Sequence, residues 1–286
     1  MGECRSRNLI VVCIGFGYLG KYLLKNLSCQ GIKSFGITSK ISKNTYVNDN
    51  LQIQSRSSIK QTINLSTNLI VTAPPNEYGC PVLRKFKAKI IKSNIKSIAY
   101  ISSTGIYGDF SGEWVNETTK PKEKIKHNKR LLAEHQWVNF CRKKKISYNV
   151  IRIAGIYGPN RVNSFQDNNN LIIRKENQYF SRIHIQDAAR IISKILLQNR
   201  RNEFWNLSDD VPSSREDFLM EVVKLKKIKN YKFINYDQAK KKISKKADSF
   251  WSKSKKVSNY KIKEKLDVVF AFPNYKRGLK SLVKYL

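Results

Sequence analysis

The chain has 286 residues, 41% of them hydrophobic, and its 55 Lys and Arg against 21 Asp and Glu give a formal net charge of +34 at pH 7. This length and apolar content are sufficient for a full hydrophobic core, which excludes a disordered chain. So large a positive charge usually indicates a phosphate-bearing partner. The lysines are nevertheless scattered along the whole chain beside abundant Asn and Ile, so compositional bias explains the charge better than a selected nucleic-acid surface does.

The densest basic run extends from Lys224 to Lys265, where lysines alternate with Phe250, Trp251 and Tyr260. Basic and aromatic residues together are typical of surfaces that bind nucleic acid, because the cations meet phosphates and the rings stack on bases. This segment keeps a nucleic-acid partner as the less favoured alternative.

The cysteines indicate a reducing compartment and no metal site. The chain has five, an odd number, with no Cys-x-x-Cys pair and no histidine at metal-ligand spacing. We therefore expect free thiols in a cytoplasmic protein, and no metal. The five are Cys4, Cys13, Cys29, Cys80 and Cys141.

Two N-terminal features resemble targeting signals. The apolar stretch from Leu9 to Leu24 is interrupted by three glycines and Lys21, and no cleavage site follows, so we interpret it as strand, turn and helix. The segment from Met1 to Ser6 fits a myristoylation pattern that is short enough to arise by chance. No segment approaches the roughly 20 apolar residues of a membrane span, and we expect no membrane partner.

The chain alternates between apolar runs typical of buried strands and segments whose apolar residues have helical spacing. The expected strands are 9–14, 34–38, 68–73, 97–102 and 148–153. The expected helices are 18–28, 82–93, 122–144, 185–198 and 213–225, the last capped by Ser213 or Ser214. This alternation predicts an α/β fold of the Rossmann type with a doubly wound parallel sheet.

A glycine-rich turn follows the first apolar run, in the segment Gly15-Phe-Gly-Tyr-Leu-Gly20. In a G-x-G-x-x-G turn between strand and helix, the first glycine permits the tight turn and the second lets a pyrophosphate approach the backbone. The third lets helix and strand pack closely, and the helix N-terminus then faces the anion. We expect dinucleotide binding by Gly15, Gly17, Tyr18, Leu19 and Gly20, and by Ala73 and Pro74 at the end of a later strand.

The end of the second strand distinguishes NADP from NAD. NAD-binding proteins usually carry Asp or Glu about 20 residues after the turn, where it bonds the ribose hydroxyls. This sequence has Gly36-Ile-Thr-Ser-Lys40 there instead. No carboxylate would repel a 2′-phosphate, and Thr38, Ser39 and Lys40 could bind one, so NADP is favoured over NAD. Lys40 could equally be one solvated lysine among many.

The regular alternation loosens after Pro159, and residues 163–170 form an Asn-rich polar loop. We therefore expect a dinucleotide-binding core at 1–160 and a small C-terminal lobe at 161–286, with a soft boundary. The lobe should pack on the carboxyl edge of the sheet, on the substrate side. A monomer or a homodimer fits this organisation.

Several segments together resemble a known family. The chain is similar to extended or atypical short-chain dehydrogenase/reductases of the NAD-dependent epimerase/dehydratase superfamily, in particular its nucleoside-diphosphate-sugar epimerase-like group. The segments occur in family order and cover most of the chain, although the last hundred residues match only faintly. They are Gly15–Gly20, Ile101–Asp109, Gly112–Glu117, Arg130–Glu134, Arg152–Pro159 and Arg182–Asp187.

The resemblance implies a catalytic Tyr, a Lys four residues later that lowers its pKa and holds the nicotinamide ribose, and a Ser that orients the substrate hydroxyl. Ser103 matches the family's Ser. The Lys position carries Arg130 and the Tyr position carries Lys126, so the usual pair is replaced. Arg130 could still bond a ribose, but a guanidinium does not donate a proton near neutral pH and Lys126 is normally cationic there.

Other residues are candidates for the missing acid/base. Tyr107 lies just past the strand that carries Ser103, although the family's Tyr-Gly is ordinarily a structural turn. His127 adjoins the vacant position and has a suitable intrinsic pKa, although a surface role on a charged helix is the simpler interpretation. Glu117 could face the substrate or cap a loop.

Four further charged or titratable residues have simpler interpretations. We expect His184 and Asp187 to lie where a helix begins, with Asp187 favourable to the helix dipole. Arg152 and Arg161 flank the exit of the strand at 148–153, where either could meet a substrate phosphate or form an ion pair.

Taken together, the sequence predicts an NADP-binding epimerase/dehydratase-like protein that acts on or senses a nucleotide sugar or a related polar metabolite. Its redox catalysis should be altered or absent. The alternative is a non-catalytic dinucleotide sensor or an RNA-associated protein on a Rossmann scaffold. The substrate itself depends on loops that carry no recognisable motif.

Overall fold

The computed structural model describes residues 9–162, 170–241, 243–244, 248 and 251–285. The chain forms two compact units, each built from separate stretches. The chain returns to the first unit after residue 187 because β12 (Glu203–Leu207) lies next to β8 (Ser147–Ile153) in the central sheet. Unit 1 has the bounds Met1–Ile106, Glu123–Arg152 and Ala188–Trp205, and unit 2 has the bounds Tyr107–Lys122, Ile153–Asp187 and Asn206–Leu286.

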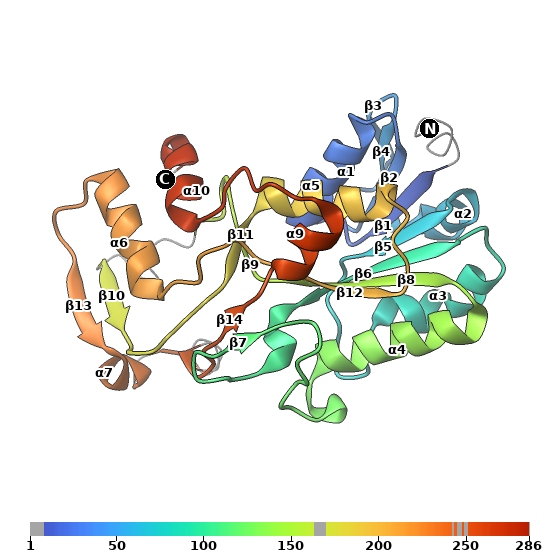
Figure 1. Ribbon diagram of the computed structural model, residues 1–286. Coiled ribbons are helices and arrows are strands. Elements are labelled where there is room, and N and C mark those ends of the chain that lie inside the picture. Colours follow the sequence, from blue (N-terminus) through green and yellow to red (C-terminus); the bar gives the residue numbers. More distant parts are fainter. Residues whose placement is uncertain (1–8, 163–169, 242, 245–247, 249–250, 286) are drawn as a thin grey trace. The chain divides into compact units, whose positions relative to one another are not determined.

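A mostly parallel, eight-stranded sheet has the order β12-β8-β6-β5-β1-β2-β4-β3 (Figure 1). Strand β1 pairs in parallel with β2 and β5, β2 pairs in parallel with β4, and β5 with β6, whereas β3 is antiparallel to β4. The predicted doubly wound sheet is confirmed. The remaining strands are β1 (Ile10–Ile14), β2 (Lys33–Thr38), β3 (Thr45–Asn48), β4 (Leu51–Ser55), β5 (Asn68–Val71) and β6 (Ser97–Ser103).

The strand order reverses at β1. The chain runs outward from β1 to β2 and β4, and then returns to form β5 on the opposite side of β1. Connections that leave neighbouring strands in opposite directions open a crevice at the carboxyl ends of those strands, which is where ligands of open α/β sheets bind. In this protein the reversal falls between β1 and β5.

Helices cover both faces of the sheet (Figure 1). On one face, alternate strand residues such as Val12, Leu69 and Tyr100 share a core with α2, α3 and α4. On the other face α1 packs closely, since a Cβ placed on Gly20 would lie 3.4 Å from Cys13 Sγ. The helices are α1 (Tyr18–Ser28), α2 (Ile59–Leu65), α3 (Pro81–Ile91), α4 (Lys129–Lys144) and α5 (Ile185–Leu197).

The start of α4 differs from the sequence prediction. A helix from residue 122 was expected, but residues Ile125–His127 form only a 3₁₀ turn, η3, and α4 begins at Lys129. The Asn128 side chain explains the later start, because its Oδ1 accepts hydrogen bonds from Arg130 N at 3.1 Å and Leu131 N at 3.2 Å and so caps the helix. The elements β3, β4, α2 and β12 were not predicted.

Unit 2 is built from short elements. Three two-stranded parallel sheets pair β9 with β11, β10 with β13, and β7 with β14. Helices α6 and α10 share an apolar core that includes Phe218, Val222 and Leu279. Ser214, one of the two predicted caps of α6, accepts from Asp217 N at 2.9 Å in a capping box.

The elements of unit 2 have the following bounds, together with the 3₁₀ turn η1 of unit 1 and η2, which spans the division between the units. They are η1 (Arg56–Ser58), η2 (Thr104–Tyr107), β7 (Trp114–Val115), β9 (Gly155–Tyr157), β10 (Leu171–Arg174), β11 (Arg182–His184), α6 (Arg215–Lys226), β13 (Lys232–Asn235), α7 (Tyr236–Lys240), β14 (Lys256–Val257), α9 (Tyr260–Leu266), α10 (Tyr275–Ser281) and η4 (Val283–Tyr285). No helix among the described residues is long and apolar enough to cross a membrane.

A buried ion pair joins α4 to β8. Arg152 Nη2 donates to Glu134 Oε2 at 2.9 Å, and the two side chains are only 7% and 3% exposed. The guanidinium also lies over the ring of Phe204, at 4.8 Å from its centroid. The ion-pair interpretation of Arg152 is therefore confirmed.

Removing one partner of this pair should be far more costly than replacing both. Glu134→Ala should lower the free energy of unfolding by about 3–5 kcal/mol, because it leaves the Arg152 guanidinium buried without its counter-ion. The double variant Glu134→Leu, Arg152→Met should lose much less, since neither charge remains. Urea unfolding followed by circular dichroism measures both losses. Equal losses in the two variants would show that the isolated charge is not the source of the cost.

Candidate functional site

Gly15 brings the end of β1 against the end of β5. Its φ of +104° lies in the region that favours glycine, and an added Cβ would lie 2.6 Å from Ala73 N and 2.7 Å from Thr72 Oγ1. The Thr72 hydroxyl also donates to the carbonyl oxygen of Gly15. No other residue fits this position without moving the strand end.

Gly17 and Gly20 have different surroundings. A Cβ on Gly17 would meet only Gly15 O, at 3.7 Å, so the space above Gly17 is open. A Cβ on Gly20 would lie 3.4 Å from Cys13 Sγ and 3.5 Å from the Phe16 ring, which reflects close packing of helix on strand. The three glycines therefore have the surroundings that tight turn, ligand approach and helix packing each require.

The open space above Gly17 lies at the N-terminus of α1. Gly17 is the N-cap residue, it contributes no side-chain cap, and the first turn of the helix carries no acidic residue. The first backbone N–H groups of a helix have no intrahelical acceptor and lie at the positive end of its dipole. A pyrophosphate fits this cradle, because no side chain fills the space above Gly17 and no carboxylate in the first turn of α1 would repel its negative charge.

The glycine turn is also fixed to the end of β2. Phe16 N donates to Ile37 O at 2.9 Å, and the Phe16 ring covers Gly36 so closely that a Cβ there would lie 2.5 Å from the ring. Thr38 follows directly, and its Oγ1 accepts from Lys40 N at 3.2 Å. The predicted residues Thr38, Ser39 and Lys40 therefore adjoin the turn, with Ser39 and Lys40 exposed.

A second cation lies at this edge of the sheet and was not predicted. Thr38, the last residue of β2, pairs with Ser55, the last residue of β4. Arg56 comes next in the chain, so it lies just beyond the end of β2, and it is exposed. Asn44 ties the neighbouring loops together, because its Oδ1 accepts from Ser55 N at 3.1 Å and its Nδ2 donates to Ser58 Oγ at 3.3 Å. The alternation of apolar residues with glutamines in Leu51–Ser55 is the sequence signal that could have found β4.

Ser103 lies at the carboxyl edge of the same sheet. Val71 pairs with Tyr100, so continuing the register places Ser103 level with Pro74, beyond the end of β5. The half-buried Ser103 hydroxyl accepts from Gly105 N at 3.1 Å. Ser103 is thus oriented at the edge that also carries the glycine turn.

Arg130 and Lys126 do not share one helical face. Arg130 is the second residue of α4, whereas Lys126 lies in the 3₁₀ turn before the Asn128 cap and is exposed, as is His127. Burial raises the pKa of Tyr100 on β6, and the positive charge of Arg130 opposes that rise. Arg130 therefore lies near this strand. The extended backbone of Asn128, with φ of −125° and ψ of 104°, separates the two positions.

Two candidate acid/base residues of unit 2 are engaged with the same neighbour. Tyr107 is fully buried, and its hydroxyl donates to Asn206 Oδ1 at 2.8 Å. Glu117 Oε1 accepts from Asn206 N, also at 2.8 Å. Both contacts lie within unit 2 and tie Tyr107 and Glu117 to Asn206, which gives each residue a structural role.

His184 and Asp187 lie at the start of α5, as predicted. Burial lowers the pKa of His184 to about 4, against the opposing charge of Asp187, and His184 Nδ1 accepts from Gln186 N at 3.3 Å. The Asp187 carboxylate accepts from Ala271 N at 3.1 Å and Phe272 N at 2.8 Å. Arg161 N donates to Gly158 O at 2.9 Å in a tight turn that follows β9.

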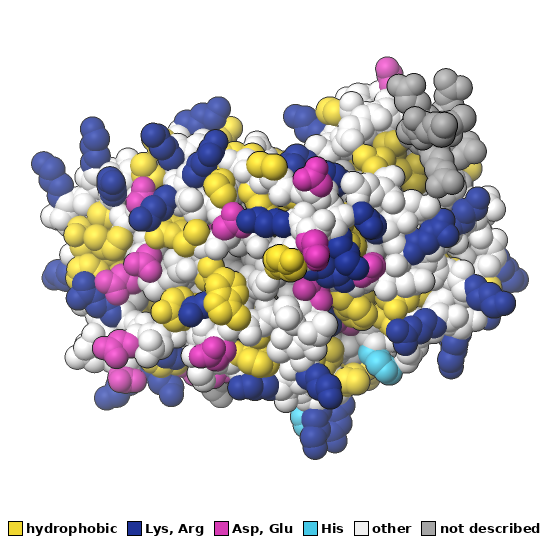
Figure 2. Space-filling view, viewed as in Figure 1, with side chains coloured by type: hydrophobic (Ala, Val, Ile, Leu, Met, Phe, Trp, Pro, Cys, Tyr) yellow, Lys and Arg dark blue, Asp and Glu magenta, His cyan; other side chains and the backbone are white. Residues whose placement is uncertain are grey.

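The basic residues do not gather on the visible face of the protein. Figure 2 shows Lys and Arg scattered among uncharged and acidic side chains. In the run from Lys224 to Lys265, Trp251 is buried and Tyr260 is 68% exposed, whereas Phe250 lies outside the described residues. A buried ring cannot stack on a base, so Trp251 is not available for the stacking that the sequence suggested, whereas the exposed ring of Tyr260 is.

The cysteines and the other potential metal ligands of the described residues form no metal site. Cys13, Cys29, Cys80 and Cys141 are free thiols, and Cys4 lies outside the described residues. No group of three or more His, Cys, Asp or Glu among the residues that the structure describes could hold a metal ion.

The comparisons with known proteins agree with this geometry. The model of the NAD-dependent epimerase/dehydratase family matches residues 60–208, more than half of the chain, and the glycine turn lies outside that range. No protein of curated function matches. A conserved protein of unknown function from Silicibacter pomeroyi DSS is 28% identical, with a TM-score of 0.83 over 96% of this chain and 98% of that one.

Two more distant structures share the fold and carry ligands. UDP-glucose 4-epimerase from Thermotoga maritima, solved with UDP-glucose, is 17% identical, with a TM-score of 0.74 over 97% of this chain and 98% of that one. Human epimerase family protein SDR39U1, isoform 2, solved with NADPH, is 14% identical, with a TM-score of 0.72 over 97% of this chain and 100% of that one. At these identities the likeness is one of fold.

The open space above Gly17 can be tested directly. Gly17→Val should abolish dinucleotide binding and leave the fold intact, because the added Cβ meets no atom of the protein closer than 3.7 Å but takes the pyrophosphate's place. Gly15→Val is the contrasting variant, and it should lower thermal stability because its Cβ overlaps the end of β5. Fluorescence titration with NADPH and a circular dichroism melt measure the two effects. Unchanged affinity in Gly17→Val would reject this site.

Proposed function

This chain belongs to the NAD-dependent epimerase/dehydratase family, and we propose that it binds NADP in preference to NAD and acts on, or senses, a nucleotide sugar or a related polar metabolite. The observation that carries the proposal is the open cradle above Gly17 at the N-terminus of α1, beside the crevice between β1 and β5. The UDP-glucose in the Thermotoga maritima structure supports the substrate class.

Different residues at this site bind different parts of the dinucleotide. The backbone of Gly17, Tyr18 and Leu19 holds the pyrophosphate, and Ala73 and Pro74 line the crevice beside it. When bound, the dinucleotide supplies a hydride donor or acceptor for a carbinol carbon of the substrate. Ser103 and Arg130, at the same edge of the sheet, orient the reacting groups.

The preference for NADP depends on charge at the end of β2. No Asp or Glu occurs from residue 33 to residue 48, whereas Lys40 and Arg56 both lie beside Thr38. A 2′-phosphate therefore meets two cations and no carboxylate, and charge-assisted hydrogen bonds to phosphate are among the strong ones.

NADP should bind about tenfold more tightly than NAD, which corresponds to about 1.4 kcal/mol. Lys40→Glu and Arg56→Glu should each remove most of that ratio, because each replaces a phosphate partner with a repelling charge. Lys87→Glu, the same charge change at an exposed position of α3, is the matched control and should leave the ratio unchanged. Isothermal titration with all four dinucleotides gives the ratio. Equal affinities for NADP and NAD in the unmodified protein would show that the two cations are incidental.

The replaced pair determines what chemistry the protein retains. A hydride can leave a carbinol carbon only if the hydroxyl proton leaves as well, and the family's phenolate acid/base is absent from position 126. Arg130 stays protonated near neutral pH, so it can hold a ribose hydroxyl or a phosphate but cannot relay a proton. We therefore propose altered or absent redox turnover, with dinucleotide sensing as the non-catalytic form of the same site.

Restoring the pair tests this proposal. The unmodified protein should show no ordinary reductase or epimerase turnover, since a missing general acid/base typically costs about 10²- to 10⁴-fold in rate. The double variant Lys126→Tyr, Arg130→Lys should raise NADP-dependent oxidation of UDP-sugars at least tenfold if the new phenol reaches the substrate from the 3₁₀ turn before Asn128, and adding Ser103→Ala should remove the gain. Absorbance of NADPH at its nicotinamide band measures turnover.

Two outcomes of that assay separate the enzyme from the sensor. Slow reduction of bound NADP by a UDP-sugar in the presence of the unmodified protein would indicate a weak enzyme. Binding of NADP without any redox change would indicate a sensor. Turnover at ordinary family rates would contradict the replaced pair, because another residue would then be supplying the proton transfer.

A further inference from the structure

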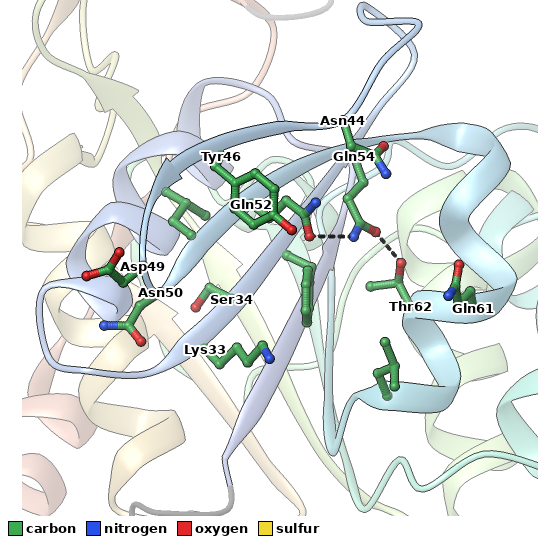
Figure 3. A pocket seen from close by; sticks show the side chains of 13 residues that line it. Lys33, Ser34, Asn44, Tyr46, Asp49, Asn50, Gln52, Gln54, Gln61 and Thr62 are labelled. Atoms are coloured by element: carbon green, nitrogen blue, oxygen red, sulfur yellow. Dashed lines mark hydrogen bonds between the residues drawn. The ribbon is translucent and has the colours of Figure 1, made fainter.

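A half-open cavity of about 380 Å³, with polar and apolar groups in its lining in nearly equal parts, lies at the β3 edge of the sheet, within unit 1 (Figure 3). Its walls are the first half of β2, the β3–β4 hairpin and one side of α2. The cavity has the size of a small-molecule site. None of the residues assigned above to the dinucleotide lines it, so the proposal below goes beyond that function.

The charge of the cavity differs from the charge of the chain. Among the lining residues only Lys33 and Asp49 are charged, and their charges cancel, whereas the whole chain carries +34. Most of the remaining polar lining consists of Asn and Gln carboxamides. An anion gains little from such a lining, because a single lysine opposes a single carboxylate. The cavity therefore suits an uncharged ligand that both donates and accepts hydrogen bonds.

A chain of hydrogen bonds fixes the orientation of the central carboxamides. The Thr62 hydroxyl donates to Gln54 Oε1, and Gln54 Nε2 donates to Gln52 Oε1 at 2.9 Å (Figure 3). Gln54 is 7% exposed, so this order is held inside the wall. Because the oxygen of Gln52 is already engaged, its amide nitrogen is the group that can donate to a ligand.

An aromatic ring stands beside that donor. Tyr46 on β3 pairs with Gln52 on β4 and is 77% exposed, and Figure 3 shows its ring at the cavity beside the Gln52 side chain. An exposed ring offers a flat apolar face next to a polar rim. A ligand that fits both features has C–H groups on one face and hydroxyl groups around its edge. A sugar ring has this form.

We propose that this cavity is a binding site for a neutral saccharide, separate from the dinucleotide site. The C–H face of the sugar packs on Tyr46, and its hydroxyl oxygens accept from the Gln52 amide. Its hydroxyl hydrogens are donated to the carboxamide oxygens of the lining, such as that of Asn50.

Saturation-transfer NMR and isothermal titration with maltose and with N-acetylglucosamine test the site. The unmodified protein should bind at least one of the two with a millimolar or lower Kd. Tyr46→Ala and Gln52→Leu should each weaken binding at least fivefold, the first by removing the ring and the second by removing the amide at similar volume. Tyr260→Ala, at a tyrosine of unit 2 that is 68% exposed, is the matched control and should bind as the unmodified protein does.

In the same assay, saccharide binding should not depend on the dinucleotide site. Gly17→Val and NADPH-saturated protein should both bind the saccharide normally, so failure of the proposed function leaves this test valid. The proposal is overturned if neither sugar binds, if the two cavity variants bind as well as the unmodified protein, or if inorganic phosphate binds there more tightly than the sugars. It is also overturned if Tyr46→Ala changes only the oligomeric state, which would make β3 a contact between copies of the chain.

Discussion

The contact between Gly15 and the start of the β5 loop is the constraint on which the rest of unit 1 depends. A Cβ at position 15 would lie 2.6 Å from Ala73 N. Only glycine therefore allows the end of β1 to come this close to the residues that follow β5. That approach turns the chain sharply enough for α1 to start at Tyr18 with its N-terminus directed at the crevice. A packing requirement inside the protein thus leaves the N-terminus of α1 uncovered by side chains at Gly17.

Local features of this arrangement could be predicted from the sequence. The glycine spacing and the apolar runs before and after it depend on neighbouring residues alone, and α1 spans Tyr18–Ser28 as expected. The site beside β2 could be predicted only in part. Arg56 reaches it through the pairing of Thr38 with Ser55, a contact between residues far apart in the chain that no local pattern encodes.

The region of the replaced catalytic pair shows a different limit of sequence reasoning. Charged residues from 122 onward have good helical propensity, yet a single capping side chain, Asn128, starts the helix seven residues later than predicted. Tyr107 and Glu117 were ambiguous in sequence for a related reason, because their shared partner Asn206 lies about ninety residues away. The return of β12 to the sheet beside β8 is another contact between distant parts of the chain that no local pattern encodes.

The Phe16 ring that covers Gly36 makes two distant positions interdependent. A side chain at position 36 would lie 2.5 Å from that ring, so it could be accommodated only after position 16 had lost its aromatic group. Conversely, a smaller residue at 16 would leave a void over a strand that lies next to β1 in the centre of the sheet, with the loss of packing that voids entail. Relatives of this chain should therefore exchange the two residues in concert, a ring with a glycine or a smaller side chain with a larger one, and a change at either position alone should be rare.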